Sequence, residues 1–146
     1  MKYLQQRGLD RLICRLKQPF LGICIGMQLM CRRSEEGNTD CLGVFNHDVV
    51  RFRPSEGIKI PHIGWNSLHN TNSPLFDGLP DNPFVYFVHS YYAAVGDDTV
   101  ATSSYAEPFS AALQRGNYYA LQFHPEKSGS VGEIILKNFM SRCSQI

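Results

Sequence analysis

The segment Pro19-Phe20-Leu21-Gly22-Ile23-Cys24-Ile25-Gly26-Met27-Gln28 joins two patterns of different period. Its first half, residues 20–24, is a continuous apolar run, which suits a strand buried on both faces. From residue 25 to about residue 36 the apolar residues follow a helical spacing, and Gly37-Asn38 supplies a stop signal. A buried strand that runs directly into a helix, with many strands after it, predicts a mixed α/β domain.

The junction has the form Gly-x-Cys-x-Gly, with Cys24 at its centre. The analogous Gly-x-Ser-x-Gly turn holds a nucleophile on a sharp corner between a strand and a helix. We expect Gly22 and Gly26 because a side chain at either position would clash with the neighbouring backbone. A helix N-terminus favours thiolate over thiol, and the N–H of Ile25 can point at a developing oxyanion. A buried structural cysteine between two packing glycines is the alternative interpretation.

A nucleophilic cysteine needs a base, and the segment Gln122-Phe123-His124-Pro125-Glu126 offers one. Residues two apart on a strand face the same way, so a carboxylate at Glu126 would hold the imidazole of His124 and stabilise its charged form. An isolated His-x-Glu is more often a surface histidine with an incidental acidic neighbour. The combination with the elbow around Cys24 favours a catalytic pair.

The rest of the chain reads as one domain over residues 1–146. We expect amphipathic helices over residues 2–16 and 131–142, where apolar residues recur at helical spacing. Between them, runs rich in valine, isoleucine and aromatic residues are separated by turn signals. The predicted strands cover residues 42–53, 58–68, 84–95, 99–105, 109–115 and 118–124.

Composition excludes several classes of protein. Apolar residues make up 43% and charged residues 18% of the chain, which excludes disorder. A net charge of +1 makes nucleic acid an improbable partner. No apolar run approaches a membrane span, and no signal peptide is evident. Five scattered cysteines without a Cys-x-x-Cys pair argue against disulfides and structural zinc, and favour the cytoplasm. We therefore expect no bound metal.

Residues 19–28 together with residues 122–126 resemble the class I glutamine amidotransferases, whose Cys–His–Glu triad falls on Cys24, His124 and Glu126. Three further stretches resemble the glutaminase subunits of imidazole glycerol phosphate synthases: residues 33–37, 61–66 and 86–91, followed by the tail at residues 124–129. The resemblance covers essentially the whole chain. It implies the flavodoxin-like three-layer α/β fold with a mixed sheet, and glutamine hydrolysis through a thioester on Cys24 without a cofactor.

The resemblance also implies roles for other residues. It places a glutamine pocket at Gly22, Ile25, Gln28, Glu36, Ser90 and Tyr91. It places a (β/α)₈-barrel cyclase subunit, to which ammonia would pass during histidine biosynthesis, against Trp65, Tyr86 and Lys127. Each of these three has a plainer explanation, because tryptophan and tyrosine on apolar strands usually pack in the core and a lone lysine is usually solvated.

Members of this family begin with a strand–helix–strand portion and a Pro-Gly-Val-Gly-like loop, whereas this chain begins at the helix over residues 2–16. We therefore expect residues 1–146 to lack the first strands and the loop that supplies an oxyanion-hole N–H. Three alternatives stay open at this point: the glutaminase subunit of another class I enzyme, such as pyridoxal phosphate synthase; a catalytically silent homologue that acts as a binding protein; and a cysteine peptidase of related fold.

Overall fold

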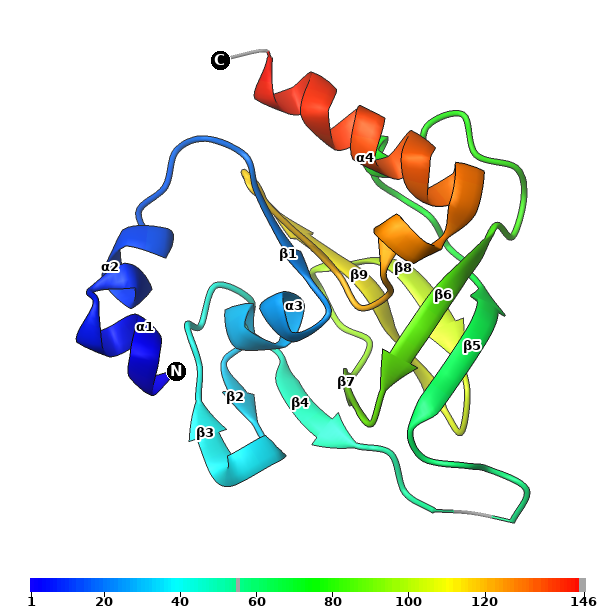
Figure 1. The fold of residues 1–146 in the computed structure, drawn as a ribbon, viewed down its shortest axis with the longest axis horizontal. Coiled ribbons are helices and arrows are strands. Elements are labelled where there is room, and N and C mark those ends of the chain that lie inside the picture. The colour runs from blue at the N-terminus through cyan, green and yellow to red at the C-terminus, as the bar shows by residue number, and fades with distance from the viewer. Residues whose placement is uncertain (55, 145–146) are drawn as a thin grey trace.

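The computed structural model describes residues 1–54 and 56–144. It is an α/β structure with mixed sheets, as the sequence predicts (Figure 1). The longer strands are β1 (Phe20–Ile23), β4 (Asp48–Arg51), β5 (His62–Ser67), β6 (Phe84–His89), β8 (Thr99–Ser104), β9 (Pro108–Arg115) and β10 (Tyr118–Leu121). The shorter strands are β2 (Arg33–Ser34), β3 (Thr39–Asp40) and β7 (Tyr91–Ala93). The α-helices are α1 (Lys2–Gln6), α2 (Leu9–Ile13), α3 (Ile25–Met30) and α4 (Gly129–Cys143).

The strands form three sheets in the described part of the chain. One has the order β1-β10-β9-β8, the second β3-β2-β4-β7, and the third is the β5–β6 pair. Strand β1 runs parallel to β10, with Gly22 opposite Ala120, whereas β9 is antiparallel to both of its neighbours, β10 and β8. Because β1 and β10 are parallel neighbours, their carboxyl ends reach the same edge, and the elbow at residue 24 meets the segment that follows residue 121.

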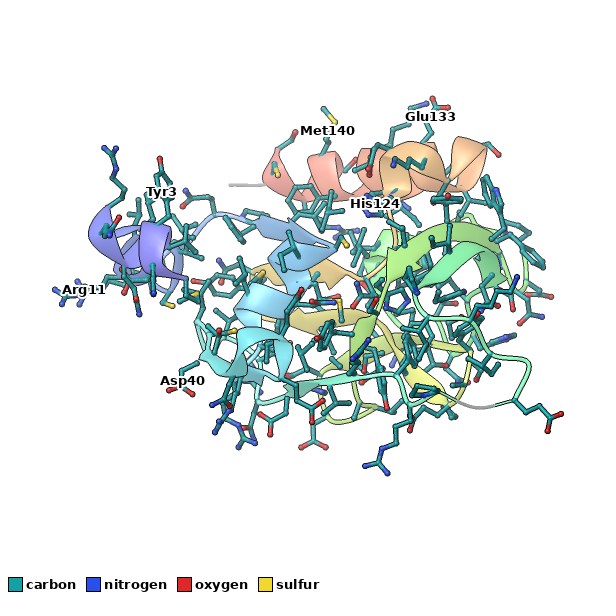
Figure 2. The ribbon with its side chains drawn as sticks, turned by 60° about the horizontal axis from the view of Figure 1, so that its bottom comes forward. Tyr3, Arg11, Asp40, His124, Glu133 and Met140 are labelled. Carbon is teal, nitrogen blue, oxygen red and sulfur yellow. The ribbon has the colours of Figure 1, made fainter. Side chains whose placement is uncertain are left out.

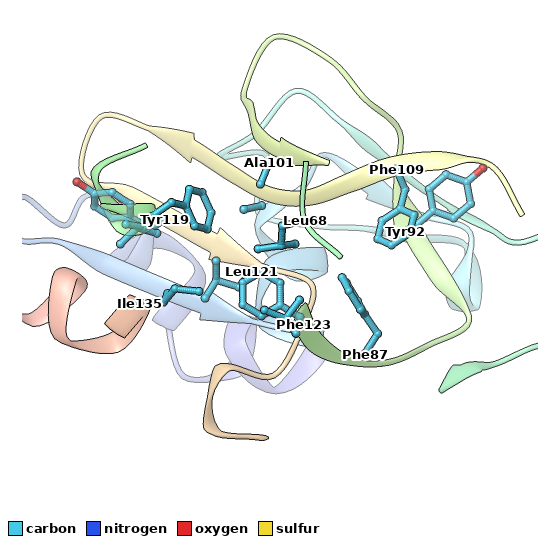
Figure 3. Close-up of a cluster of buried hydrophobic side chains, with 14 of the residues drawn as sticks. Leu68, Phe87, Tyr92, Ala101, Phe109, Tyr119, Leu121, Phe123 and Ile135 are labelled. Atoms are coloured by element: carbon cyan, nitrogen blue, oxygen red, sulfur yellow. The ribbon is translucent and has the colours of Figure 1, made fainter. Parts of the chain in front are cut away.

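The core lies between this first sheet, α4 and the β5–β6 pair. Figure 3 shows Leu121, Phe123 and Phe87 packed with Ile135 of α4 and with Phe109 of β9. A smaller cluster around Met27, Met30 and Phe45 holds α3 against the second sheet. Figure 1 shows α1 and α2 at one end of the molecule and the β5–β6 pair at the other. The site at the end of β1 therefore stands on elements that are packed from several sides.

Several predicted boundaries differ from the structure. The helix expected over residues 2–16 is two short helices, because Gly8 adopts a left-handed conformation with φ of 65° between them. No residue of α1 or α2 is buried. The strand expected over residues 84–95 is divided at Ser90 into β6 and β7, which belong to different sheets.

The helix expected over residues 25–36 ends at Met30. The backbone of Arg32 and Glu35 instead donates hydrogen bonds to the carbonyls of His47 and Val49, at 2.9 Å each, so residues 33–34 form a strand beside β4. The apolar run of β1 pairs with β10 on one side only among the described residues, and Gly22 is its buried residue. The expectation that the family's first strands and oxyanion loop lie outside residues 1–146 stays a prediction.

Candidate active site

Cys24 lies at the turn between β1 and α3, as the elbow motif predicts. Its φ is +51° and its ψ is −108°, a conformation that non-glycine residues rarely adopt and that is held here by the surrounding structure. Its amide donates a 2.7 Å hydrogen bond to the carbonyl of Leu121 at the end of β10. The backbone strain and this clamp from the neighbouring strand fix where the sulfur points.

The two glycines of the elbow have different roles. A Cβ on Gly22 would lie 2.6 Å from Sδ of Met30 and 2.9 Å from the carbonyl of Gly26, so a glycine is required for β1 and α3 to approach. A Cβ on Gly26 would meet nothing within 4 Å. The expected clash at Gly26 is therefore wrong. Gly22 is buried beneath the elbow and does not line the cavity that Cys24 faces.

A cavity of about 270 Å³ opens beside Cys24. Five of the residues expected at the glutamine pocket line it together with Cys24: Ile25, Gln28, Glu36, Ser90 and Tyr91. Pro61, Val88 and His89 complete the lining, and the sequence analysis does not single out these three as pocket residues. These three residues lie in the segments 61–66 and 86–91, which the sequence marks only by their resemblance to the family. That resemblance does not indicate that their side chains reach the cavity.

Gln28 is buried, and its side chain is held from two sides. Its Nε2 donates to the carbonyl of Tyr91 at 2.9 Å and to Oε1 of Gln122 at 3.0 Å. Both hydrogens of the amide are therefore used within the protein. Glu36, by contrast, is exposed on the short 3₁₀ turn Glu36–Asn38 at the rim. The cavity thus combines one rigid amide with one free carboxylate.

His124 and Glu126 form the expected pair on an unexpected element. Nδ1 of His124 lies 2.7 Å from Oε1 of Glu126. They do not stand on a strand, because β10 ends at Leu121 and residues 125–127 form a 3₁₀ turn with Pro125 in its first position. The predicted strand over residues 118–124 is therefore too long, and it is the tight turn that brings the carboxylate back to the imidazole.

The other nitrogen of His124 is free. Nε2 is buried without a hydrogen-bond partner among the described residues, while Nδ1 is occupied by Glu126. Figure 2 shows His124 beneath α4, on the loop that follows β10. Sγ of Cys24 lies 3.8 Å from the carbonyl oxygen of Val88 and 3.9 Å from Nε2 of Gln122. No hydrogen bond joins Cys24 to His124 within the described residues, and an unsatisfied base is left for a further partner.

Burial is the dominant electrostatic effect on Cys24. Desolvation raises the pKa of its thiol, the hydrogen bond from the Ile25 backbone lowers it, and the charges of Glu126 and Glu36 raise it while Lys127 lowers it. Burial therefore opposes the thiolate form that the helix N-terminus is expected to favour. A base that takes the thiol proton is therefore required before the sulfur can act as a nucleophile.

Trp65, Tyr86 and Lys127 lie together, and none of the three lines the cavity. Trp65 is opposite Tyr86 in the β5–β6 ladder, with ring centroids 5.9 Å apart in an edge-to-face arrangement. Nζ of Lys127 lies 6.0 Å from the centre of the Tyr86 ring. Trp65 is 55% exposed, with Ile63 at 59% and Phe84 at 58% beside it. The expectation that Trp65 could simply be core is wrong.

In the described residues no helix is long and apolar enough to cross a membrane, and no three acidic, histidine or cysteine side chains gather as metal ligands would. An elbow cysteine, a buried histidine nitrogen and a carboxylate behind it are the groups that cysteine-dependent hydrolases and transferases use. Residues 4–143 match the family model described as glutamine amidotransferase class-I, and the chain belongs to this family.

Among curated relatives, the chain is 57% identical over 141 residues to the "Imidazole glycerol phosphate synthase subunit HisH" of Bacteroides fragilis, covering 96% of this chain and 72% of that protein. It is 46% identical over 142 residues to the protein of the same name from Escherichia coli K12, with the same two coverages of 96% and 72%. These similarities confirm the resemblance seen in the motifs.

Solved structures give the same fold. A putative GMP synthase protein from Thermoplasma acidophilum has a TM-score of 0.70 at 25% identity, over 94% of this chain and 63% of that one. A further glutamine amidotransferase has a TM-score of 0.67 at 16% identity, over 98% of this chain and 72% of that one. The class I glutamine amidotransferase fold predicted from the sequence is confirmed, and the cysteine peptidase alternative is wrong.

Proposed function

We propose that this chain is the glutaminase subunit of an imidazole glycerol phosphate synthase in histidine biosynthesis. It hydrolyses glutamine to glutamate and ammonia and delivers the ammonia to a cyclase partner. The observation that carries the proposal is the 57% identity to proteins of that name over 96% of the chain, with Cys24 facing a cavity at the elbow.

Cys24 is the nucleophile and His124 is its base. Nε2 of His124 takes the thiol proton, and the sulfur attacks the side-chain carbonyl of glutamine. His124 then returns the proton to the departing nitrogen, which leaves as ammonia, and a γ-glutamyl thioester remains. A water molecule that gives its proton to the same nitrogen hydrolyses the thioester, so that glutamate leaves and the thiol is restored.

Glu126 orients and supports the base. Nδ1 of His124 donates its hydrogen to the carboxylate at 2.7 Å, which leaves Nε2 without a proton and able to act as an acceptor. When Nε2 takes the thiol proton, the ring becomes an imidazolium beside a carboxylate. The N–H of Ile25, already directed at the sulfur, serves the oxyanion of the tetrahedral intermediate.

Glutamine occupies the cavity of about 270 Å³ beside Cys24. Because both hydrogens of the Gln28 amide are used within the protein, its oxygen is the group that remains to accept from the substrate. Glu36 at the rim provides a charge for the substrate ammonium, and the backbone at Ser90 and Tyr91 borders the opposite side.

The cyclase partner, a (β/α)₈ barrel, binds the exposed face of the β5–β6 pair around Trp65, Tyr86 and Lys127. Three large apolar side chains on this face are more than half exposed, namely Ile63, Trp65 and Phe84. Such a patch is expected to be covered by another protein surface. Val88, on the same strand pair, reaches the cavity and accepts from Cys24, so the patch continues to the site of ammonia release.

The experiment is to incubate the protein with glutamine, with and without a cyclase partner, and to measure glutamate. Coupled formation of imidazole glycerol phosphate from the partner's substrate then tests ammonia delivery. Glutamate release that depends on Cys24 and rises with the cyclase supports the proposal. Glutamate release without any effect on the cyclase reaction would assign the chain to another class I enzyme, and no glutamate with any partner would make it a silent homologue.

A further inference from the structure

Two buried histidines that have no part in the proposed chemistry face each other across the β5–β6 ladder. His62 is 3% exposed and His89 is 6% exposed. They are directly opposite in the register, and Nδ1 of His62 lies 3.1 Å from Nε2 of His89. Buried polar side chains of this kind are costly unless they are hydrogen-bonded, so the arrangement of their partners is informative.

The hydrogen bonds of this pair have a fixed direction. Nδ1 of His89 lies 2.8 Å from the carbonyl oxygen of Tyr91, which can only accept, so Nδ1 of His89 carries a hydrogen. Burial lowers the pKa of both histidines to about 4, so both rings are neutral. A neutral His89 then accepts at Nε2, and Nδ1 of His62 is the donor between the two rings.

The same carbonyl connects the pair to the candidate active site. The oxygen of Tyr91 also accepts from Nε2 of Gln28 at 2.9 Å. The second hydrogen of that amide goes to Oε1 of Gln122 at 3.0 Å, and Nε2 of Gln122 points to Sγ of Cys24 at 3.9 Å. A series of contacts therefore joins His62 and His89 to the Tyr91 carbonyl, which accepts from both His89 and Gln28, and continues from Gln28 through Gln122 to Sγ of Cys24. We call it the relay.

Aromatic packing limits the freedom of both histidine rings. His62 stacks on Tyr105 with centroids 4.0 Å apart and on Phe87 at 5.1 Å. His89 meets Phe52 at 5.2 Å and Phe109 at 5.1 Å, both at steep angles. Since each ring is held by its neighbours, the Tyr91 carbonyl receives its hydrogen bond from a donor that has few other positions available.

We propose that His62 and His89 are positioning residues for the reaction at Cys24. The relay anchors the Tyr91 carbonyl and the Gln28 amide to the β5–β6 pair, and thereby sets the geometry of glutamine against the sulfur. The proposal rests on the proposed glutaminase function. Precise orientation matters because a shift of about 1 Å in a reacting group can cost about a hundredfold in rate.

Two substitutions of His89 separate the two nitrogens of its ring. Asparagine places its amide nitrogen near the position of Nδ1 and can still donate to Tyr91, whereas glutamine reaches the position of Nε2 instead. In the complex with the cyclase partner, His89→Gln should lower kcat for glutamine hydrolysis about tenfold or more, with a change in KM below about threefold. His89→Asn should retain kcat within about threefold of wild type.

Two more variants test the role of His62 and the effect of the packing around His89. His62→Phe keeps an aromatic ring against Tyr105 but removes the donor to His89, and it should lower kcat by an intermediate factor. Phe109→Leu disturbs the packing of His89 without removing a hydrogen bond, and serves as the control for lost stability. It should lower the melting temperature at least as much as His89→Gln does, with kcat close to wild type below the transition.

The outcomes decide the proposal. The proposal is overturned if His89→Asn and His89→Gln have equal kcat, or if these variants change KM alone. It is also overturned if His62→Phe keeps the wild-type kcat, or if Phe109→Leu loses as much kcat as the histidine variants. A partner-free measurement separates this proposal from the proposed function: the rate at which Cys24 reacts with iodoacetamide. Suppose that the wild-type protein hydrolyses no glutamine, but Cys24 is alkylated at different rates in His89→Gln and His89→Asn. The proposed function would then be wrong, and the positioning role of the relay would stand.

Discussion

Nδ1 of His124 lies 2.7 Å from Oε1 of Glu126, and Nε2 on the other side of the same ring is buried without a hydrogen-bond partner among the described residues. One nitrogen is thus committed to a carboxylate and the other is free to accept. A general base for a thiol requires this difference between the two nitrogens. The hydrogen bond from Nδ1 to the carboxylate fixes the tautomer in which Nε2 carries no proton.

We expect Glu126→Gln to reduce activity less than His124→Ala does. The carboxylate orients the ring and stabilises its charge, whereas the ring itself carries the proton. His124→Ala should lower kcat by more than about 10³-fold, and the loss in Glu126→Gln should be smaller by about tenfold or more. Glutamate release in the presence of the cyclase measures both. Wild-type rates in Glu126→Gln would show that this exposed carboxylate is a bystander.

Cys24→Ala should abolish glutamine hydrolysis and leave binding of the cyclase partner intact. In the proposed mechanism the sulfur is the attacking atom, and the surface around Trp65 does not include it. Glutamate release and complex formation by gel filtration are the two measurements. Cys41→Ala, at a partly buried thiol with no proposed role, is the matched control. Retention of more than about a hundredth of wild-type activity in Cys24→Ala would remove the nucleophile assignment.

The elbow was predictable because its signal is local. The spacing of Gly22 and Cys24 at the end of an apolar run describes a turn whose geometry the same few residues determine, and the φ of +51° at Cys24 fits it. The pairing of His124 with Glu126 was also predicted, but from strand geometry. The contact is in fact formed by the 3₁₀ turn Pro125–Lys127. A turn of three residues is too short to be recognised from the periodicity of apolar residues.

The predictions that differ from the structure concern segments whose local structure depends on distant parts of the chain. Residues 32–35 continue a helical pattern, yet they leave the helix because β4 offers hydrogen bonds to their backbone. His89 was missed as a cavity residue for a related reason. Its role depends on the register between β5 and β6 and on the carbonyl of Tyr91, and neither is visible in the spacing of residues along one strand.

Lys127→Glu should weaken coupling to the cyclase more than it alters the chemistry at Cys24. Lys127 is an exposed cation beside Tyr86 on the proposed partner surface, and reversal of its charge places a repulsive or unpaired group there. We expect glutamine-dependent synthesis to fall about tenfold while alkylation of Cys24 stays within about twofold of wild type. Lys2→Glu on α1, at the opposite end of the molecule, is the control. Unchanged complex formation and synthesis in Lys127→Glu would withdraw the interface role.

The pair His62–His89 should make the protein less stable as the pH falls. Both folded-state pKa values are lowered to about 4 by burial, while an unfolded histidine titrates near its ordinary value of about 6.5. Between these values the unfolded state binds more protons, so the stability that is present above about pH 6.5 is lost progressively down to about pH 4. The charges of His62 and His124 also lower the pKa of His89, by less than burial does.

His62→Phe tests this directly, since it removes one titrating ring and keeps the stacking. The free energy of unfolding in urea, measured at pH 7 and at pH 5, should decrease less in His62→Phe than in wild type. One proton corresponds to about 1.4 kcal/mol per pH unit, which is the largest difference in slope that one histidine can cause. Parallel pH profiles for the two proteins would mean that the pKa of His62 is the same in the folded and unfolded states, and that burial does not lower it.

The last prediction separates the two glycines of the elbow. In Gly22→Ala the new methyl would lie 2.6 Å from Sδ of Met30 and 2.9 Å from the carbonyl of Gly26, and that carbonyl cannot move without disturbing the first turn of α3. Overpacking of this kind typically costs about 1–3 kcal/mol. In Gly26→Ala the methyl meets nothing within 4 Å, and alanine is the better helix former by up to about 1 kcal/mol.

Gly22→Ala should therefore lower the free energy of unfolding and the rate of Cys24 alkylation together, because displacement of α3 moves the Ile25 N–H away from the sulfur. Gly26→Ala should fold with at least wild-type stability. Urea unfolding and iodoacetamide kinetics on the two variants provide the comparison. If Gly26→Ala were the more destabilised of the two, the close contact that shapes the elbow would lie at the helix side of Cys24, and the packing of β1 on Met30 would not be what holds the nucleophile in place.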